Sequence, residues 1–486
     1  MHRSMQYASI FKGLGLIILV IAAGLLVPTA FAFVRATDHL SAFVYSLLVS
    51  LGVGLCLVVL PKSKHSLKFR DGYALVAFGW LSAGLFGALP YWFSGSAAQF
   101  TNAYFESISG FTTTGATIFS DIESLSPPIL LWRSMTQWLG GMGIIVLSLA
   151  ILPYLDLGGM SIFQAEVPGP TAEKLTPRIQ DTAKALWQVY FLLTALLSLL
   201  LWLAGMTAFE AINHSFTAMS TGGFSTSNSS IAGFQSPLIE WILVGFMAVA
   251  GINFALHYRF LFKGFHPKTY FRDSELIFYA CLMAGAAAVV ATAILLRQGG
   301  SVDQTVRDAA FTVVSLLTTT GYGTADYLLW PVFCQFVLIF LMLIGGCAGS
   351  TAGGIKTVRV LLVFKYMYTE MLKLLHPNLI RSVKLGTTTV ERNVLASILG
   401  FIFIYVGVMS ASILLVSLET QDFLTAVGSV VASLSNIGPG LGTVGPTSNY
   451  AHLGSFTKWI LSLDMAMGRL EIVTILILFL PRAWVK

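Results

Sequence analysis

Four short segments of the chain combine glycine with Thr, Ser or Asn, a pairing that can hold a cation through oxygen atoms. They occupy residues 112–116, 220–224, 318–322 and 436–440. Glycine in such a turn adopts left-handed dihedrals, which let successive carbonyl oxygens point the same way, and Thr or Ser adds hydroxyl oxygens. Rings of these oxygens replace the hydration shell of a monovalent cation. The residue types therefore predict selective cation binding that needs no buried carboxylate.

Three residues from each segment are expected to line this site. They are Thr113, Thr114 and Gly115; Ser220, Thr221 and Gly222; Thr319, Thr320 and Gly321; and Asn436, Ile437 and Gly438. Aligning the four glycines gives separations of 107, 99 and 117 residues. A single Thr-Gly turn is also an ordinary helix C-cap. Four aligned turns, each between two apolar runs, favour the ion site.

The elements that must position these segments are membrane helices. Of the residues, 56% are hydrophobic and 10% are charged, and the mean hydropathy is +0.79. Soluble domains carry about 25% charged residues. Water could not solvate so apolar a surface, so the chain is predicted to be a polytopic membrane protein. The composition excludes a secreted disulfide scaffold, a nucleic-acid binder and a disordered chain.

Ten apolar windows are long enough to cross the bilayer, which takes about 20 helical residues. They fall near residues 11–34, 40–60, 72–93, 129–153, 186–206, 238–262, 275–297, 331–362, 393–418 and 457–480. Ten spans place both termini on one side. The loops of that side hold 21 Lys and Arg residues and those of the other side hold three, so both termini are predicted to be cytoplasmic.

The opposite side collects acidic residues. Among them are Glu106, Asp121, Glu123, Glu210, Asp303, Asp308, Asp326, Glu419 and Asp422. An acidic outer vestibule would concentrate cations. The alternative is that acids simply remain where basic residues are excluded.

A repeat of about 100 residues organises the chain, because each glycine segment ends a weakly apolar stretch of about 12 residues that lies between two spans. Such a stretch suits a re-entrant helix. The predicted fold is an all-α polytopic membrane protein, with an N-terminal two-helix hairpin and four pseudo-fourfold membrane–pore-helix–membrane repeats around a central pore. The predicted units are the hairpin, residues 1–70, and the repeats, residues 71–158, 159–270, 271–390 (with a broken second span) and 391–486.

The eighth window is interrupted by residues 345–356, which contain five glycines among twelve residues. Each Gly costs a helix about 1 kcal/mol relative to Ala, so a regular helix is not expected there. The candidate gate residues in this stretch are Gly346, Gly349, Ser350, Thr351, Gly353 and Lys356. A small-residue packing face is the alternative, since Gly345 and Gly349 have GxxxG spacing. A phosphate-binding loop is rejected, because Ile355 precedes Lys356 and no βαβ unit follows; no cofactor is expected in this chain.

Arg469 lies inside the tenth window, where an arginine costs at least about 2.5 kcal/mol. It should therefore face a pore or a partner. Asp464 and Glu471 are poorly placed to pair with it on one helix. Its partner is expected on another segment, and a structural ion pair between helices is one interpretation.

With these motifs the chain resembles the Trk/Ktr/HKT superfamily of potassium-transporting membrane subunits, specifically the bacterial Trk-type subunit. The resemblance covers the hairpin, the four repeats and the broken span, and the four glycine segments look like the family's filter segments. In that family a glycine at the first filter position, here Gly115, goes with potassium preference. The resemblance also implies that residues 345–356 form an intramembrane loop that obstructs the pore below the filter, and that Arg469 contacts this loop as a positive barrier.

The same resemblance implies partners. They are a second copy in a homodimer, each subunit with its own pore, and a cytosolic nucleotide-binding regulatory ring (TrkA-like) that would carry NAD or ATP/ADP. Lys365, Lys373, Arg381 and Lys384 are candidates to contact this ring or anionic lipid, and the sequence leaves both open. The implied location is the bacterial inner membrane.

The predicted function is gated, potassium-selective translocation down the electrochemical gradient, with potassium as the substrate. The alternative is a proton- or sodium-coupled symporter, a class typified by inverted repeats and midplane carboxylates. Here the repeats are parallel and midplane carboxylates are few. An enzyme is disfavoured, because the sequence has no HExxH or GxSxG motif and no clustered Asp/His set.

Overall fold

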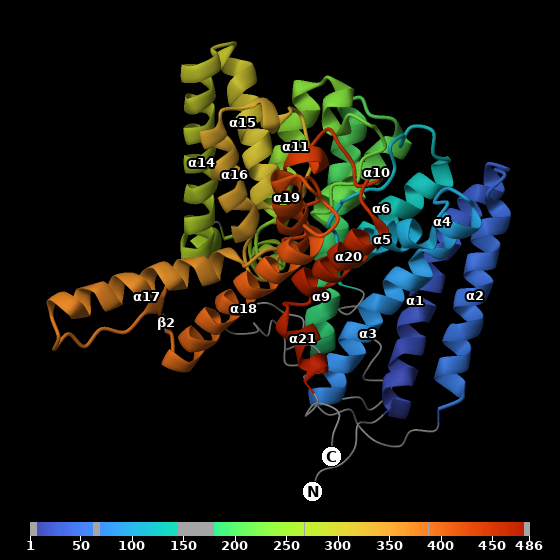
Figure 1. Ribbon diagram of the computed structural model, residues 1–486, viewed down its shortest axis with the longest axis horizontal. Helices are drawn as coiled ribbons and strands as arrows, with labels where there is room; N and C mark the ends of the chain where they lie inside the picture. Colours follow the sequence, from blue (N-terminus) through green and yellow to red (C-terminus); the bar gives the residue numbers. More distant parts are fainter. Residues whose placement is uncertain (1–6, 62–68, 144–178, 267, 387, 481–486) are drawn as a thin grey trace, which may run out of the picture.

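The computed structural model describes residues 7–61, 69–143, 179–266, 268–386 and 388–480. It is mainly helical, and one antiparallel hairpin pairs β1 (Lys384–Leu385) with β2 (Thr388–Thr389). Figure 1 shows long helices standing around a central group of shorter ones, with α17 (Thr357–Leu375) projecting from the body.

Long apolar helices form the outer part of the molecule. The hairpin α1 (Tyr7–Val34) and α2 (Leu40–Val59) is followed by α3 (Phe69–Gly87) with α4 (Leu89–Phe93), then by α9 (Ile179–Leu203), α14 (Ser274–Gln298) and α18 (Arg392–Val416). These are the six helices long and apolar enough to cross a membrane. Only 22% of the most apolar window of α14 and of α18 is buried, against 72% for α3 and α4. The outer helices therefore leave apolar faces for lipid, while α3 packs inside.

Four short helices follow the long ones and end at the glycine segments. They are α5 (Phe100–Phe111), α10 (Ala208–Met219), α15 (Val302–Leu317) and α19 (Phe423–Leu434). Thr207 and Glu210 form a reciprocal capping box at the start of α10, and Asp422 accepts the Thr425 N–H at the start of α19. Such caps satisfy backbone donors that the first turn leaves free.

A second set of helices leads away from the glycine segments, and the second, third and fourth of them are interrupted. The set is α6 (Pro127–Gly141), α11 (Pro237–Ala250), α16 (Val332–Ile344) and α20 (Ser455–Arg469). A bend of 98° separates α11 from α12 (Phe254–Phe262), after which comes α13 (Lys268–Phe271). The loop 345–356 separates α16 from α17, and Glu471 and Ile472, both at positive φ, separate α20 from α21 (Val473–Leu476).

The apolar windows 238–262 and 457–480, which were predicted as candidate spans, do not each form one continuous helix. The break expected only in the third repeat also occurs in the second and the fourth. Helix α6 ends at Gly141, and the rest of the predicted span 129–153 lies outside the described residues, as does the predicted boundary at residue 158. By length and composition the described chain has six spanning helices, or seven if α11 and α12 count as one span. Hydropathy missed the breaks because apolar residues continue on both sides of them.

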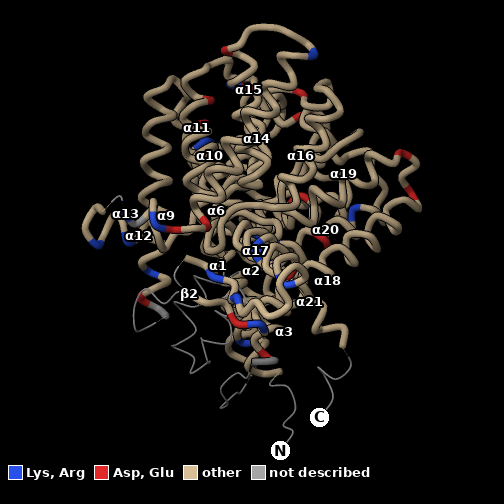
Figure 2. The backbone as a smooth tube through the Cα atoms, turned by 90° about the vertical axis from the view of Figure 1, so that its left-hand side faces the viewer, with Lys and Arg blue, Asp and Glu red and all other residues tan. Residues whose placement is uncertain are grey.

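Charge is distributed unevenly along the long direction of the spanning helices. Figure 2 shows Asp and Glu mostly around the end that holds the loop between α14 and α15, and Lys and Arg mostly in the half that holds α3, α17 and α21. The placement of the termini in the cytoplasm stays a prediction, and it rests on this same asymmetry.

Glycines let the second helices approach the carbonyl ends of the short helices. A Cβ on Gly140 of α6 would lie 1.8 Å from the Phe111 carbonyl oxygen, and one on Gly468 of α20 would lie 2.1 Å from that of Leu434. A Cβ on Gly353 would lie 2.3 Å from the Ser435 carbonyl oxygen. Contacts this close leave no room for a side chain, so these positions fix how closely the repeats pack.

We expect Gly140→Ala to destabilise the protein by about 1–3 kcal/mol, because overpacking forces backbone to shift. Gly285→Ala on α14 is the matched control, since nothing lies within 4 Å of its added Cβ and alanine favours the helix. Thermal unfolding in detergent micelles measures both. Equal melting temperatures for Gly140→Ala and the unmodified chain would contradict this account of the packing.

Candidate functional site

The four glycine segments share one backbone conformation. Each short helix ends in a non-glycine residue at positive φ, followed two positions later by a glycine at positive φ. The pairs are Thr113 (56°) and Gly115 (82°), Thr221 (53°) and Gly223 (74°), Thr319 (57°) and Gly321 (79°), and Asn436 (57°) and Gly438 (95°). The residue between them donates its N–H to the carbonyl five positions back, at 2.9 Å for Thr114, 2.9 Å for Gly222, 2.8 Å for Thr320 and 2.9 Å for Ile437.

This geometry corrects the alignment of the second repeat by one residue. The glycine equivalent to Gly115 is Gly223, whereas Gly222 occupies the position of Thr114. The repeat separations are therefore 108, 98 and 117 residues. Adjacent glycines at 222 and 223 made the two alignments indistinguishable in the sequence, and only the backbone dihedrals separate them.

Each of the four glycines contacts the next repeat, and the last contacts the first, so that they form a closed ring. We call Gly115, Gly223, Gly321 and Gly438 the glycine ring. An added Cβ on Gly115 would lie 2.0 Å from the Gly222 carbonyl oxygen, and one on Gly223 would lie 1.9 Å from that of Thr320. In the same way, an added Cβ on Gly321 would lie 1.9 Å from the Ile437 carbonyl oxygen, and one on Gly438 would lie 2.7 Å from that of Thr114. Every repeat thus places a carbonyl oxygen against the glycine of its neighbour. The arrangement brings together all four sequence-predicted segments and gathers oxygen atoms suited to a dehydrated cation.

Side chains that the sequence analysis did not single out hold the ring in place. The Gln137 side chain of α6 donates to the Gly222 oxygen at 2.7 Å and accepts the Phe224 N–H at 3.0 Å. The Tyr450 hydroxyl donates to the Gly438 oxygen at 2.6 Å. Asn436, which was predicted, donates to the Thr114 hydroxyl and the Met465 oxygen, each at 2.9 Å. A buried amide such as Gln137 within an apolar window was the available signal.

A cavity of about 160 Å³ lies against the glycine ring and is lined by all four of its glycines. Arg133 is the charged residue in its wall, and no Asp or Glu of the described chain lines it. The cavity walls are otherwise backbone, hydroxyl and apolar groups, with Asn228 and Asn449 at the edge.

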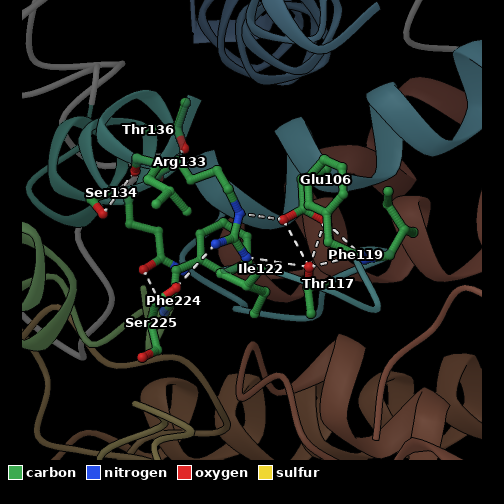
Figure 3. Close-up of polar contacts among 12 residues, drawn as sticks. Glu106, Thr117, Phe119, Ile122, Arg133, Ser134, Thr136, Phe224 and Ser225 are labelled. Carbon is green, nitrogen blue, oxygen red and sulfur yellow. Dashed lines mark hydrogen bonds and ion pairs between the residues drawn. The ribbon is translucent and has the colours of Figure 1, made fainter. Parts of the chain in front are cut away.

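Glu106 does not belong to an exposed acidic vestibule, contrary to the expectation from its side of the membrane. Its side chain is completely buried and pairs with Arg133 at 2.8 Å (Figure 3). Other acids of that group serve helix starts. Glu210 caps α10, and the Asp422 carboxylate accepts both the N–H and the hydroxyl of Thr425, which lowers its pKa. Each of these three acids has a local hydrogen-bonding partner, and an acidic outer vestibule stays a prediction.

The loop 345–356 lies directly beneath the glycine segments and contacts three repeats. The Thr351 hydroxyl donates to the Met219 oxygen at 3.1 Å, and the Gly353 N–H donates to the Thr319 hydroxyl at 2.7 Å. Gly353 also lies against the Ser435 oxygen. Lys356 is buried and its ammonium donates to the Ala352 oxygen inside the loop. Ser350 donates to the Cys347 oxygen at 2.6 Å.

The break between α11 and α12 supports this loop from one side. The Cys347 N–H donates to the Gly251 oxygen at 2.9 Å, and the Phe254 N–H donates to the Gly349 oxygen at 3.0 Å. Asn253 caps α12 through the Ala255 N–H and lies close to Gly349. Gly346 packs tightly on Ala352. The break between α11 and α12 and the loop 345–356 thus hydrogen-bond to each other through backbone groups that have no partner within a helix.

Arg469 joins the loop to the first repeat. Its guanidinium donates to the Thr351 oxygen at 2.6 Å and to the Gly140 and Gly141 oxygens at 2.9 and 2.7 Å. Partners of Arg469 were expected on other segments, and the hydrogen-bond acceptors found there are backbone carbonyl groups. Glu471 pairs instead with Arg359 of α17 at 2.6 Å.

Comparison of the chain with known proteins identifies its family. A family model described as TrkH, "Cation transport protein", matches residues 39–484. The chain belongs to the TrkH family of cation transport proteins. This confirms the resemblance found in the sequence.

Relatives of this TrkH-family chain match it along almost its whole length. It is 41% identical to the Trk system potassium uptake protein TrkH of Escherichia coli (strain K12), over 99% of this chain and 100% of that protein. It is 36% identical to the Trk system potassium uptake protein TrkG of the same strain, over 87% of each. The crystal structure of the potassium transporter TrkH from Vibrio parahaemolyticus superposes with a TM-score of 0.90 at 37% identity, covering 99% of this chain and 100% of that one. These relatives are transport proteins and not enzymes, as predicted.

The basic residues of this TrkH-family chain that were proposed as contacts lie on or next to the projecting helix α17. Lys365 donates to the Lys384 oxygen at 2.9 Å, and the Arg381 guanidinium lies 5.4 Å from the Tyr368 ring centroid. Lys373 pairs with Glu370 at 2.6 Å. These contacts brace the strand hairpin against α17, and contact with a ring or with lipid stays a prediction.

We expect Gln137→Leu to destabilise this TrkH-family chain by about 1–3 kcal/mol, because the Gly222 oxygen and the Phe224 N–H would be left buried and unpaired. Gln99→Leu is the matched control, since Gln99 is exposed and its side chain makes no cap hydrogen bond. Thermal unfolding in micelles measures both variants. A loss for Gln99→Leu as large as that for Gln137→Leu would count against a specific role of the amide.

Proposed function

We propose that this TrkH-family chain is a gated potassium-selective translocation subunit, which takes up potassium across the bacterial inner membrane down its electrochemical gradient. The observation that carries the proposal is the glycine ring, in which four repeats place carbonyl oxygens around one cavity. The relative from Escherichia coli is named a potassium uptake protein, and the solved relative from Vibrio parahaemolyticus is named a potassium transporter.

The ring has the chemistry of a filter for a weakly hydrated monovalent cation. Its oxygens come from backbone and from hydroxyl side chains such as those of Thr114 and Thr320, which are fully buried. The C-terminal end of each short helix, worth roughly half a negative charge, lies at the ring. A membrane potential contributes about 2.3 kcal/mol per charge for each 100 mV, so uptake needs no reaction catalysed by this chain.

The loop 345–356 is proposed as the gate, with Arg469 and Lys356 as its positive charges. The loop is held under the ring by hydrogen bonds to the second, third and fourth repeats. A cytosolic nucleotide-binding ring would open it, and the subunit would act as a homodimer, each copy with its own pore. The five units proposed for the chain are the hairpin and the four repeats.

A proton- or sodium-coupled symporter is the second candidate. The described residues that line the cavity include no carboxylate to carry a proton, which favours the passive pore.

Uptake of rubidium-86 into liposomes that contain only this purified chain tests the function. An outward potassium gradient supplies the driving force, with sodium and proton gradients absent. Accumulation competed by potassium and poorly by sodium is the expected result. Uptake only under an imposed proton or sodium gradient would instead establish coupled transport.

We expect Gly223→Ser to lower the ratio of potassium to sodium permeability as much as Gly115→Ser does, because both side chains would displace a ring carbonyl. Gly95→Ser is the matched control, since Gly95 also has positive φ, at 71°, but nothing lies within 4 Å of its added Cβ. Competition of rubidium uptake by each cation gives the ratio. An unchanged ratio in Gly223→Ser would remove Gly223 from the filter.

We expect Arg469→Ala to raise basal rubidium flux, because it removes the hydrogen bond to Thr351 and the two to Gly140 and Gly141 that together join the loop to α6, and it removes a positive charge below the ring. Flux through purified chains in liposomes, without any partner, measures the effect. Loss of all flux in a variant that elutes and melts like the unmodified chain would favour a purely structural role.

A further inference from the structure

We propose that the buried ion pair of Glu106 and Arg133 is a specificity-determining positioning pair, which ties the first filter segment to the second and keeps the outer mouth of the ring electrically neutral. The inference deepens the proposed function and rests on it.

Glu106 anchors the chain just beyond the first ring glycine. Its carboxylate accepts the Thr117 hydroxyl at 3.0 Å and the Ile118 N–H at 2.9 Å, while Thr117 lies two positions after Gly115 (Figure 3). The side chain of Glu106 is 0% exposed. The carboxylate therefore fixes the position of Thr117 and Ile118, where the chain leaves the first glycine segment.

Arg133 extends the same anchor to the second repeat. Its guanidinium donates to the Ser225 oxygen at 3.1 Å and to the Thr117 hydroxyl at 3.3 Å, and it lies 4.2 Å from the centroid of the Phe224 ring. Ser225 lies two positions after Gly223, the place that Thr117 has after Gly115. One arginine thus holds equivalent points of two neighbouring segments at a fixed separation.

The ion pair of Glu106 and Arg133 has no equivalent at the corresponding positions of the other three repeats. The positions equivalent to Glu106, nine residues before each ring glycine, are His214, Thr312 and Ser429. His214 contacts the Ser225 hydroxyl at 3.1 Å, so the second repeat has a neutral version of the same contact. Only the first of these four positions carries a carboxylate, and its arginine partner lines the cavity at the ring.

Charge balance at this place matters because Arg133 faces the path of a cation. A guanidinium without its carboxylate would repel cations that enter the cavity, since fields are focused in a cleft with low-dielectric walls. A carboxylate without its guanidinium would be a buried unpaired charge beside the filter. The pair supplies two polar anchors to the backbone and adds no net charge.

The test measures rubidium-86 uptake and its competition by potassium and sodium in liposomes of the full chain. Glu106→Gln keeps the shape of the side chain and leaves the arginine charge. We expect uptake to fall by about tenfold or more, with a steeper dependence on ionic strength and a lower potassium-to-sodium ratio. The double variant Glu106→Gln with Arg133→Gln should recover uptake, because no charge is left unpaired, but should keep the lower ratio, because the anchor is lost.

Glu240→Gln is the matched control. Glu240 pairs with Arg307 at 2.6 Å in a mostly buried ion pair, and neither residue lines the cavity. We expect it to leave the cation ratio unchanged. An equal change of ratio in Glu240→Gln would overturn the inference, as would an unchanged ratio in a folded Glu106→Gln chain. If Glu106→Gln does not fold, the double variant decides by its ratio alone.

Failure of the proposed function looks different. In that case the unmodified chain shows no selective passive uptake, whereas failure of this inference leaves uptake selective and the variants unaltered.

Discussion

Every backbone N–H and C=O inside a bilayer must find a partner within the protein, because hydrocarbon offers none. The glycine ring depends on an exception to that rule, because the proposed ion site needs carbonyl groups released from helices. The short helices α5, α10, α15 and α19 end at this depth and release such groups together. Side-chain donors of the surrounding structure then hold these turns: Gln137 donates to the Gly222 oxygen, Tyr450 to the Gly438 oxygen and Arg133 to the Ser225 oxygen.

The same requirement explains the lower half of the molecule. The interrupted second helices of the second, third and fourth repeats create free backbone groups below the ring, and groups of the second and third repeats bond to one another. Gly251 accepts from the loop 345–356, and the loop accepts from Phe254. Arg469 closes the set by donating to carbonyl groups at the end of α6 and in the loop. Few helical hydrogen bonds would have to break if the loop moved as the proposed gate.

Departures from symmetry carry the specific chemistry. The four turns have nearly identical backbones, yet the groups behind them differ: an ion pair lies behind the first turn, His214 behind the second, and the hydroxyls of Tyr327 and Tyr450 donate to the fourth segment. Repeats joined in one chain can differ in this way, whereas four identical subunits could not. The loop in the third repeat and Arg469 in the fourth are the corresponding departures on the lower side.

Composition and periodicity were enough to predict a helical membrane protein, the fourfold repeat and its glycine segments, because each depends on local residue types in a hydrocarbon solvent. The sequence also singled out residues 345–356 and Arg469, since glycine-rich and charged stretches are costly in a membrane. It could not align Gly222 and Gly223, because both glycines permit the required dihedrals. It could not find the breaks in α11 and α20 or the pairing of Glu106 with Arg133, 27 residues away. These features arise from contacts between distant segments, whose geometry only the packed tertiary structure decides.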